Sequence, residues 1–218
     1  MNQKTNITHF DLRSTPFHIN YRLHGSIPKG KRQEIQQRRQ QATIDMQRRL
    51  HGLKGRLYEE AHRIKSRKLR DLTEQLLENA LHDRAVGPRH LNLPRVRTTV
   101  LESWQFLQTE GLIDLHAVCV MSNHVHVVAA GAGDEPDVDI SRLMQRHKNF
   151  TALKCNRLME RRGQPFWSAN YFDRTVRQGS WLTVMWYVLN NPVKAGMVEW
   201  WGDWAGTYVN PRFEVYFL

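Results

Sequence analysis

Cysteine is scarce in this sequence of 218 residues: Cys119 and Cys155 are the two thiols, and they stand far apart. Two isolated cysteines exclude a disulfide framework and a thiolate zinc cage, and they suit a reducing compartment. No apolar run reaches the length of about 18 residues that a membrane-spanning helix requires. The first residues, MNQKTNITHFDLRS, have no apolar segment typical of a signal peptide, so we expect a soluble, cytoplasmic protein.

Acidic residues are also few. The sequence has 21 Asp or Glu against 32 Lys or Arg, a net charge of +11, and a pI near 10.0. Such an excess attracts polyanions, of which nucleic acid is the commonest, although an anionic membrane or a ribosome would be attracted equally. With 40% hydrophobic and 10% aromatic residues the chain can bury a core, which excludes global disorder.

Nearly all of the positive excess lies in residues 29–70, which hold 14 Lys or Arg against 4 Asp or Glu. Apolar residues recur there at helical spacing, and the pattern predicts two helices over residues 31–82, broken near residues 52–55. A solvated helical face is one interpretation of this charge run. Acidic partners are scarce, however, which favours an external polyanion, and the DNA-contact candidates are Arg38, Arg39, Arg48 and Arg49.

The remaining chain alternates between strand and helix patterns. We predict strands at 16–24, 112–121, 124–130 and 170–177, helices at 95–108, 140–161 and 181–190, and an acidic loop at 131–139. The second and third strands form a hairpin through Ser122-Asn123. This order implies an α+β fold, an antiparallel sheet with helices packed on it. We expect one domain, 1–218, with a basic helical insertion at 30–84 and an aromatic tail at 200–218.

Two histidines provide the first candidate site. Side chains two apart in a strand point to the same face, so His124 and His126 lie side by side, within reach of one divalent ion. Val125 points to the opposite face, into apolar packing. Taken alone, the pattern is weak, because paired histidines in a strand also serve as hydrogen-bonded scaffolding.

Tyr187 and Asn191 strengthen this hypothesis. Four residues apart on a helix, a phenol and an amide share one face. The amide oxygen is a plausible third ligand, and two imidazoles with one carbonyl oxygen suit Mg²⁺ or Mn²⁺. A phenol held beside a metal-bound phosphate can attack it as a nucleophile. The alternative for Tyr187 is a core aromatic of an amphipathic helix.

Four segments carry a family resemblance: GPRHLNLPRVR (87–97), LHAVCVMSNHVHVV (115–128), QPFWSANYFDRTVR (164–177) and YVLNNPVKAGMV (187–198). In this order they resemble the REP-associated tyrosine transposases, which are HUH (His-hydrophobe-His) nucleases similar to the IS200-like transposases. The likeness covers roughly residues 85–200, with a fainter match at the first strand. Four ordered motifs are far more specific than one pair of histidines.

The resemblance implies a role for each site residue. His124 and His126 match the family's metal ligands, Asn191 matches the polar third ligand and Tyr187 matches the nucleophile. The implied reaction is metal-assisted cleavage of single-stranded DNA beside a hairpin, which leaves a 5′-phosphotyrosine and a free 3′-OH. Rejoining is the reverse step. The resemblance also implies a protein associated with the nucleoid, which is either a monomer or a homodimer.

Other basic and aromatic residues are secondary candidates. Lys148, Lys154 and Arg157 on the helix at 140–161 either track DNA phosphates or are solvated, and the same holds for Lys194 beside the tyrosine motif. The basic insertion is longer than in short family members. It is either a hairpin-binding element or a lineage-specific addition. Aromatics of the tail either stack on unpaired bases or, as we favour, pack into a core or lid. Cys119 is expected to be a small buried residue.

Three hypotheses of function compete. The first is an active strand transferase. The second is a domesticated DNA-binding protein without catalysis, against which the intact quartet of two histidines, Tyr187 and Asn191 argues. The third is a metal hydrolase that activates water, for which the motifs show no neighbouring carboxylate base.

Overall fold

The structure is a computed structural model that describes residues 14–83, 87–132 and 138–218. The chain divides into two compact units. Residues 25–87 form one, here called the helical unit, and the residues up to His24 and from Pro88 onward form the other, the sheet unit. Residues 133–137 of the predicted acidic loop lie outside the described residues.

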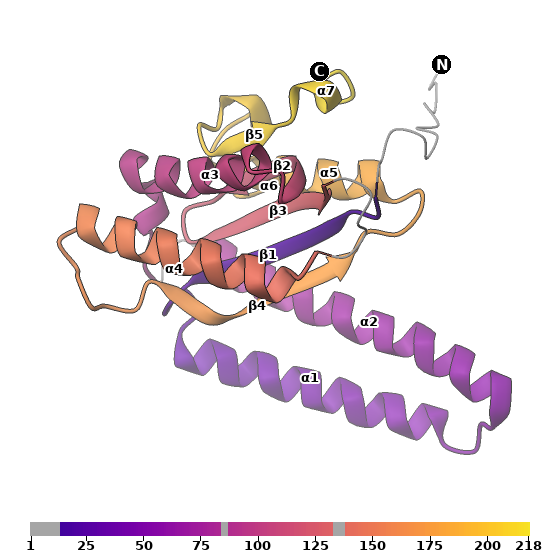
Figure 1. Ribbon diagram of the computed structural model, residues 1–218. Coiled ribbons are helices and arrows are strands. Elements are labelled where there is room, and N and C mark those ends of the chain that lie inside the picture. The colour runs from indigo at the N-terminus through magenta and orange to yellow at the C-terminus, as the bar shows by residue number, and fades with distance from the viewer. Residues whose placement is uncertain (1–13, 84–86, 133–137) are drawn as a thin grey trace. The chain divides into compact units, whose positions relative to one another are not determined.

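The helical unit is a pair of helices, α1 (Lys29–Leu50) and α2 (Gly55–His82), which Figure 1 shows as a hairpin. Both helices and the break between them are therefore as predicted. Gly52 lies in that break with φ at +87°, in the left-handed region where a side chain would be strained. A small apolar cluster stabilises the unit and consists of Ile27, Ile35, Ala80 and Leu81.

The sheet unit is built on a five-stranded antiparallel sheet in the order β4-β1-β3-β2-β5. The predicted α+β class is confirmed. The central strand β3 carries the two motif histidines and pairs with β1 on one side and β2 on the other. The strands are β1 (Phe17–Leu23), β2 (Ile113–Val120), β3 (His124–Gly131), β4 (Trp167–Thr175) and β5 (Thr207–Val209).

One face of the sheet is covered by α3 (Pro94–Thr109) and α4 (Ile140–Leu158), which lie side by side in Figure 1. Alternate residues of the strands point to this face, including Ile19 from β1 and Val125 and Val127 from β3. They pack with apolar side chains of both helices in the larger core. The period of two in the strands thus leaves the intervening positions for the other face.

The other face is covered by α5 (Trp181–Leu189), whose apolar side chains pack against β2 and β3. The aromatic tail contributes Trp201, Phe213 and Phe217 to this second core, which confirms core packing for these three residues. Short helices complete the unit: η2 (His90–Asn92), α6 (Asn191–Lys194), η3 (Trp201–Asp203) and α7 (Pro211–Glu214). Among the described residues, no helix is both long and apolar enough to cross a membrane.

Several predicted boundaries are wrong by a few residues. Strand β4 begins at Trp167 rather than at residue 170, because Leu23 of β1 pairs with Trp167 and extends the β1–β4 ladder to that residue. Helix α4 ends at Leu158 rather than at residue 161. Glu160 has a φ of 58°, and a right-handed helix cannot continue through a residue with positive φ. Strand β5 was not predicted, because three residues are too few to show a period.

Candidate functional site

His124 and His126 project from β3 toward the sheet face that α5 covers, as the alternation along the strand predicts. Both side chains are buried. Their ring centroids are 4.9 Å apart with the rings nearly perpendicular. A ring nitrogen of one lies within 4.8 Å of a ring nitrogen of the other. The pair is therefore close enough for one ion to contact both imidazoles.

The hydrogen bond of His124 sets its tautomer. Its Nδ1–H donates to Oδ1 of Asn123, the turn residue that precedes it, over 2.7 Å. Because that nitrogen carries the proton, the ring's lone pair is on Nε2. A side chain that orients a ligand histidine in this way raises the basicity of the other nitrogen. The Ser122-Asn123 turn thus fixes the first candidate ligand as well as joining two strands.

His18 plays the corresponding part for His126 and was missed by sequence reasoning. The Nε2 of His18 lies 3.2 Å from Nδ1 of His126, and the two rings stack with centroids 5.4 Å apart and an interplanar angle of 6°. His18 is fully buried. A signal was available, since Phe17 and Ile19 face the opposite core and leave His18 on the histidine face. Only the pairing of β1 with β3 gives that position a partner.

Tyr187 lies on α5, above these histidines. Its ring stands edge-on to His126 with 5.6 Å between centroids, and edge-on to His18 with 5.9 Å. The Nζ of Lys194 lies 4.6 Å from the centre of the same phenol ring. Tyr187 is partly exposed, whereas the histidines are buried. The half-open phenol can meet a large substrate, and a cation stands beside it.

Asn191 begins α6, directly after the one-residue junction that follows α5. Its Nδ2 donates to the carbonyl of Tyr187 over 2.9 Å, so the amide closes the end of α5. Its Oδ1 is buried and has no hydrogen-bond partner among the residues that the structure describes. An unbonded buried acceptor is costly, and a cation is one group that satisfies it. The donor chemistry thus fits the predicted third ligand.

The predicted DNA contacts are distributed over separate elements. Lys194 lies at Tyr187, as described above. Lys148, Lys154 and Arg157 lie on α4, which covers the opposite sheet face from the histidines. The amine of Lys148 donates to the carbonyls of Ser168 and Ala169 at 2.6 and 2.8 Å, and burial together with the charge of Arg22 lowers its pKa. Four further candidates are exposed on α1: Arg38, Arg39, Arg48 and Arg49.

Cys119 lies opposite His126 in the β2–β3 ladder and is fully buried, as predicted. Its thiol contacts the sulfur of Met121 at 3.5 Å. A second buried histidine, His116, accepts a hydrogen bond from Trp181 on its Nδ1 over 2.9 Å. Burial lowers the pKa of His116, and the carboxylate of Asp114 partly offsets this. His116 therefore anchors α5, the helix that positions Tyr187.

A family model of DNA-processing enzymes matches the part of the chain that carries the site. Residues 89–191 match the family model described as "Transposase IS200 like", a segment that includes both histidines, Tyr187 and Asn191. The predicted family resemblance is thereby confirmed.

A solved structure of similar fold belongs to a related kind of protein. The chain is similar to a REP-associated tyrosine transposase bound to a REP hairpin, with a TM-score of 0.51 and 12% sequence identity. The likeness covers 95% of this chain and 82% of that one. Among curated proteins, no sequence matches this chain.

Proposed function

We propose that this protein is a transposase that cuts and rejoins single-stranded DNA through Tyr187. The observation that carries the proposal is the edge-on position of the Tyr187 ring against His126, with 5.6 Å between centroids. Both residues lie within the segment that matches the family model. The similar solved protein is bound to a REP hairpin, which favours hairpin DNA with a single-stranded flank as the substrate.

Tyr187 supplies the covalent chemistry. Its Oη attacks the scissile phosphorus, a bond from Oη to phosphorus forms, and the bond from phosphorus to the 3′-oxygen breaks. The phenol proton leaves to solvent, and the departing 3′-oxygen takes up a proton to become a 3′-OH. The ammonium of Lys194 over the ring stabilises negative charge that develops on Oη. The reverse attack by a 3′-OH restores a phosphodiester without ATP.

The ligands that would hold a divalent ion are His124, His126 and Asn191. Imidazole nitrogens and an amide oxygen suit Mn²⁺ or Mg²⁺, and such an ion, when bound, polarises the phosphate and stabilises its charge. Asn123 and His18 orient the two imidazoles. The unbonded Oδ1 of Asn191 supports the inclusion of the amide in this set.

Covalent capture tests the proposal. The whole protein is incubated with Mn²⁺ and a labelled oligonucleotide that carries a hairpin and a single-stranded flank, and the products are separated on a denaturing protein gel. We expect a labelled protein band that Tyr187→Phe abolishes. The matched control is Tyr171→Phe, which removes a partly exposed phenol whose hydroxyl lies 3.3 Å from that of Ser141.

Each other outcome contradicts the proposal in a different way. Cleavage without a labelled protein band would assign a hydrolase that activates water. Binding without cleavage in the presence of Mn²⁺ would assign a DNA-binding protein without catalysis. Equal loss of the band in both tyrosine variants would show that the loss is not specific to Tyr187, and would contradict its role as the nucleophile.

A further inference from the structure

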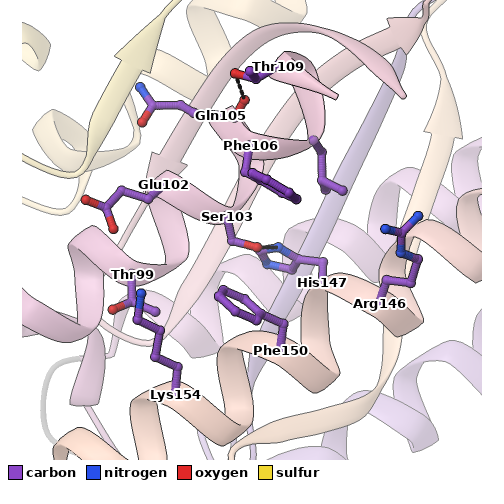
Figure 2. Close-up of a pocket in the computed structure, with 11 residues that line it drawn as sticks. Thr99, Glu102, Ser103, Gln105, Phe106, Thr109, Arg146, His147, Phe150 and Lys154 are labelled. Atoms are coloured by element: carbon purple, nitrogen blue, oxygen red, sulfur yellow. Dashed lines mark hydrogen bonds between the residues drawn. The ribbon is translucent and has the colours of Figure 1, made fainter. Parts of the chain in front are cut away.

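A cavity of about 550 Å³ lies between α3 and α4, on the sheet face opposite the histidines. This volume is within the range of sites that hold small molecules, about 300–1,000 Å³. Figure 2 shows the residues that line it. None of them belongs to the candidate site of Tyr187, so the cavity is separate from that site.

Two phenylalanines flank the cavity. Phe106 from α3 is 55% exposed and Phe150 from α4 is 51% exposed. In Figure 2 the two rings lie on either side of the Ser103–His147 pair. A single exposed aromatic is common, but two exposed aromatics that line one cavity from different helices form an apolar surface on each side of it. Rings in this arrangement offer stacking surfaces to a planar group.

The charge around the cavity is positive. Helix α4 has five Lys or Arg and no Asp or Glu between Ile140 and Leu158. Arg146 and Lys154 of this helix line the cavity, and Glu102 of α3 is the acid in the lining. The Nζ of Lys154 lies 5.6 Å from the ring centre of Phe150. An anion with a planar, apolar part complements such a surface.

The floor of the cavity is polar but already bonded within the protein. Ser103 Oγ lies 2.9 Å from His147 Nδ1, and the Tyr21 hydroxyl lies 2.6 Å from His147 Nε2. Both nitrogens of the imidazole are thus engaged, so His147 has no free ring nitrogen for a ligand in the cavity. Proteins that hold single strands combine aromatic stacking with cations along the backbone in the same way.

We propose that the α3–α4 cavity binds an unpaired nucleotide of single-stranded DNA. Its base stacks on Phe106 and Phe150, and its flanking phosphates contact Arg146 and Lys154. Because stacking is tolerant of sequence, the site discriminates weakly among bases. The site lies on the far face of the sheet, and it holds a stretch of strand separate from the one that Tyr187 would cut. It stands whether or not Tyr187 is catalytic.

Binding measurements with the whole protein test this site. Fluorescence anisotropy follows a labelled single-stranded oligothymidine without metal, so that no cleavage contributes. Phe106→Ala and Phe150→Ala should each weaken binding by about 5- to 150-fold, whereas Phe150→Trp should preserve it. The matched control is Leu153→Ala, an exposed apolar residue of α4 outside the cavity lining. Arg146→Ala with Lys154→Ala should reduce the salt slope by about 1.4, at about 0.7 for each phosphate contact.

Photocrosslinking locates the base directly. An oligonucleotide that contains 5-iododeoxyuridine is irradiated with the protein, and the crosslinked residue is found by mass spectrometry. Crosslinks at Phe106 or Phe150 support the proposal. Unchanged affinity in both alanine variants would overturn the proposal, because the two rings would then not contact the DNA. Equal losses of affinity for a duplex of the same length would also overturn it, because they would indicate contact with phosphates alone.

Discussion

His147 should make the stability of the sheet unit depend on pH. This residue belongs to α4, and its ring nitrogens bond to Ser103 of α3 and Tyr21 of β1. Burial, together with the neighbouring charge of Lys148, lowers its pKa from 6.5 to about 3. The folded protein therefore keeps this imidazole neutral over the whole mildly acidic range.

The sign follows from proton uptake in the two states. Below about pH 6.5 the histidine of the unfolded chain takes up a proton, whereas the folded chain takes up none until about pH 3. The unfolded state therefore gains protons as the pH falls, and the free energy of unfolding drops by about 1.4 kcal/mol per unit. At pH 7.5 the contribution is fully present, and about 2 kcal/mol of it is lost by pH 5.

Urea unfolding followed by tryptophan fluorescence measures this loss. All seven tryptophans lie between residues 104 and 204, so the signal reports the sheet unit and not the helical unit. The linear extrapolation gives the free energy of unfolding at each pH. His90 and His116, whose pKa values burial also lowers, contribute with the same sign.

The comparison with His147→Phe isolates the residue of interest, because the other histidines are common to both proteins. The variant starts from a lower stability, since the Ser103 and Tyr21 hydroxyls lose a partner. We expect the difference between the two proteins to shrink by about 2 kcal/mol from pH 7.5 to pH 5. Parallel curves would refute the reasoning, because they would mean that folded His147 is protonated as easily as unfolded.

Three further outcomes are expected. His18→Gln should lower the affinity for Mn²⁺ by about 10- to 100-fold in calorimetric titration, because the neighbouring ligand loses its orienting ring; an unchanged affinity would contradict that role. Trp204→Phe removes the hydrogen bond of its indole to the Val120 carbonyl and should cost about 1 kcal/mol in urea unfolding. Thr151→Val leaves the indole of Trp167 without its buried acceptor and should cost about 1–3 kcal/mol in the same assay, more than Thr109→Val on the surface.

The sequence predicted the elements whose signal is local. Alternation in β3 correctly assigned the two motif histidines to one face and Val125 to the other, because a strand's period fixes side-chain direction without reference to its neighbours. The glycines at 52 and 55 marked the break between α1 and α2 for a similar reason. The spacing of Tyr187 and Asn191 indicated that they are close.

What sequence reasoning missed depends on which segments meet. His18 is 108 positions from His126, and only the register of β1 against β3 gives its ring a partner. The cations of α4 were predicted either to contact phosphates or to be solvated, without regard to face, and the fold places them across the sheet from Tyr187. Strand β5 exists because Thr207 and its neighbours pair with β2, a contact that three residues cannot signal.

The hydrogen bond from Asn191 to the carbonyl of Tyr187 has a consequence for tolerance to substitution. One amide group ends the helix of the phenol and, in the proposed site, would also present its oxygen to the ion, so the phenol and the ion would be linked through this side chain. Gln at this position would keep the amide but lengthen the link by one methylene. Aspartate would keep the length but lose the donor. In the proposed site, the alignment of the attacking oxygen and the ion would thus depend on the size of a single side chain.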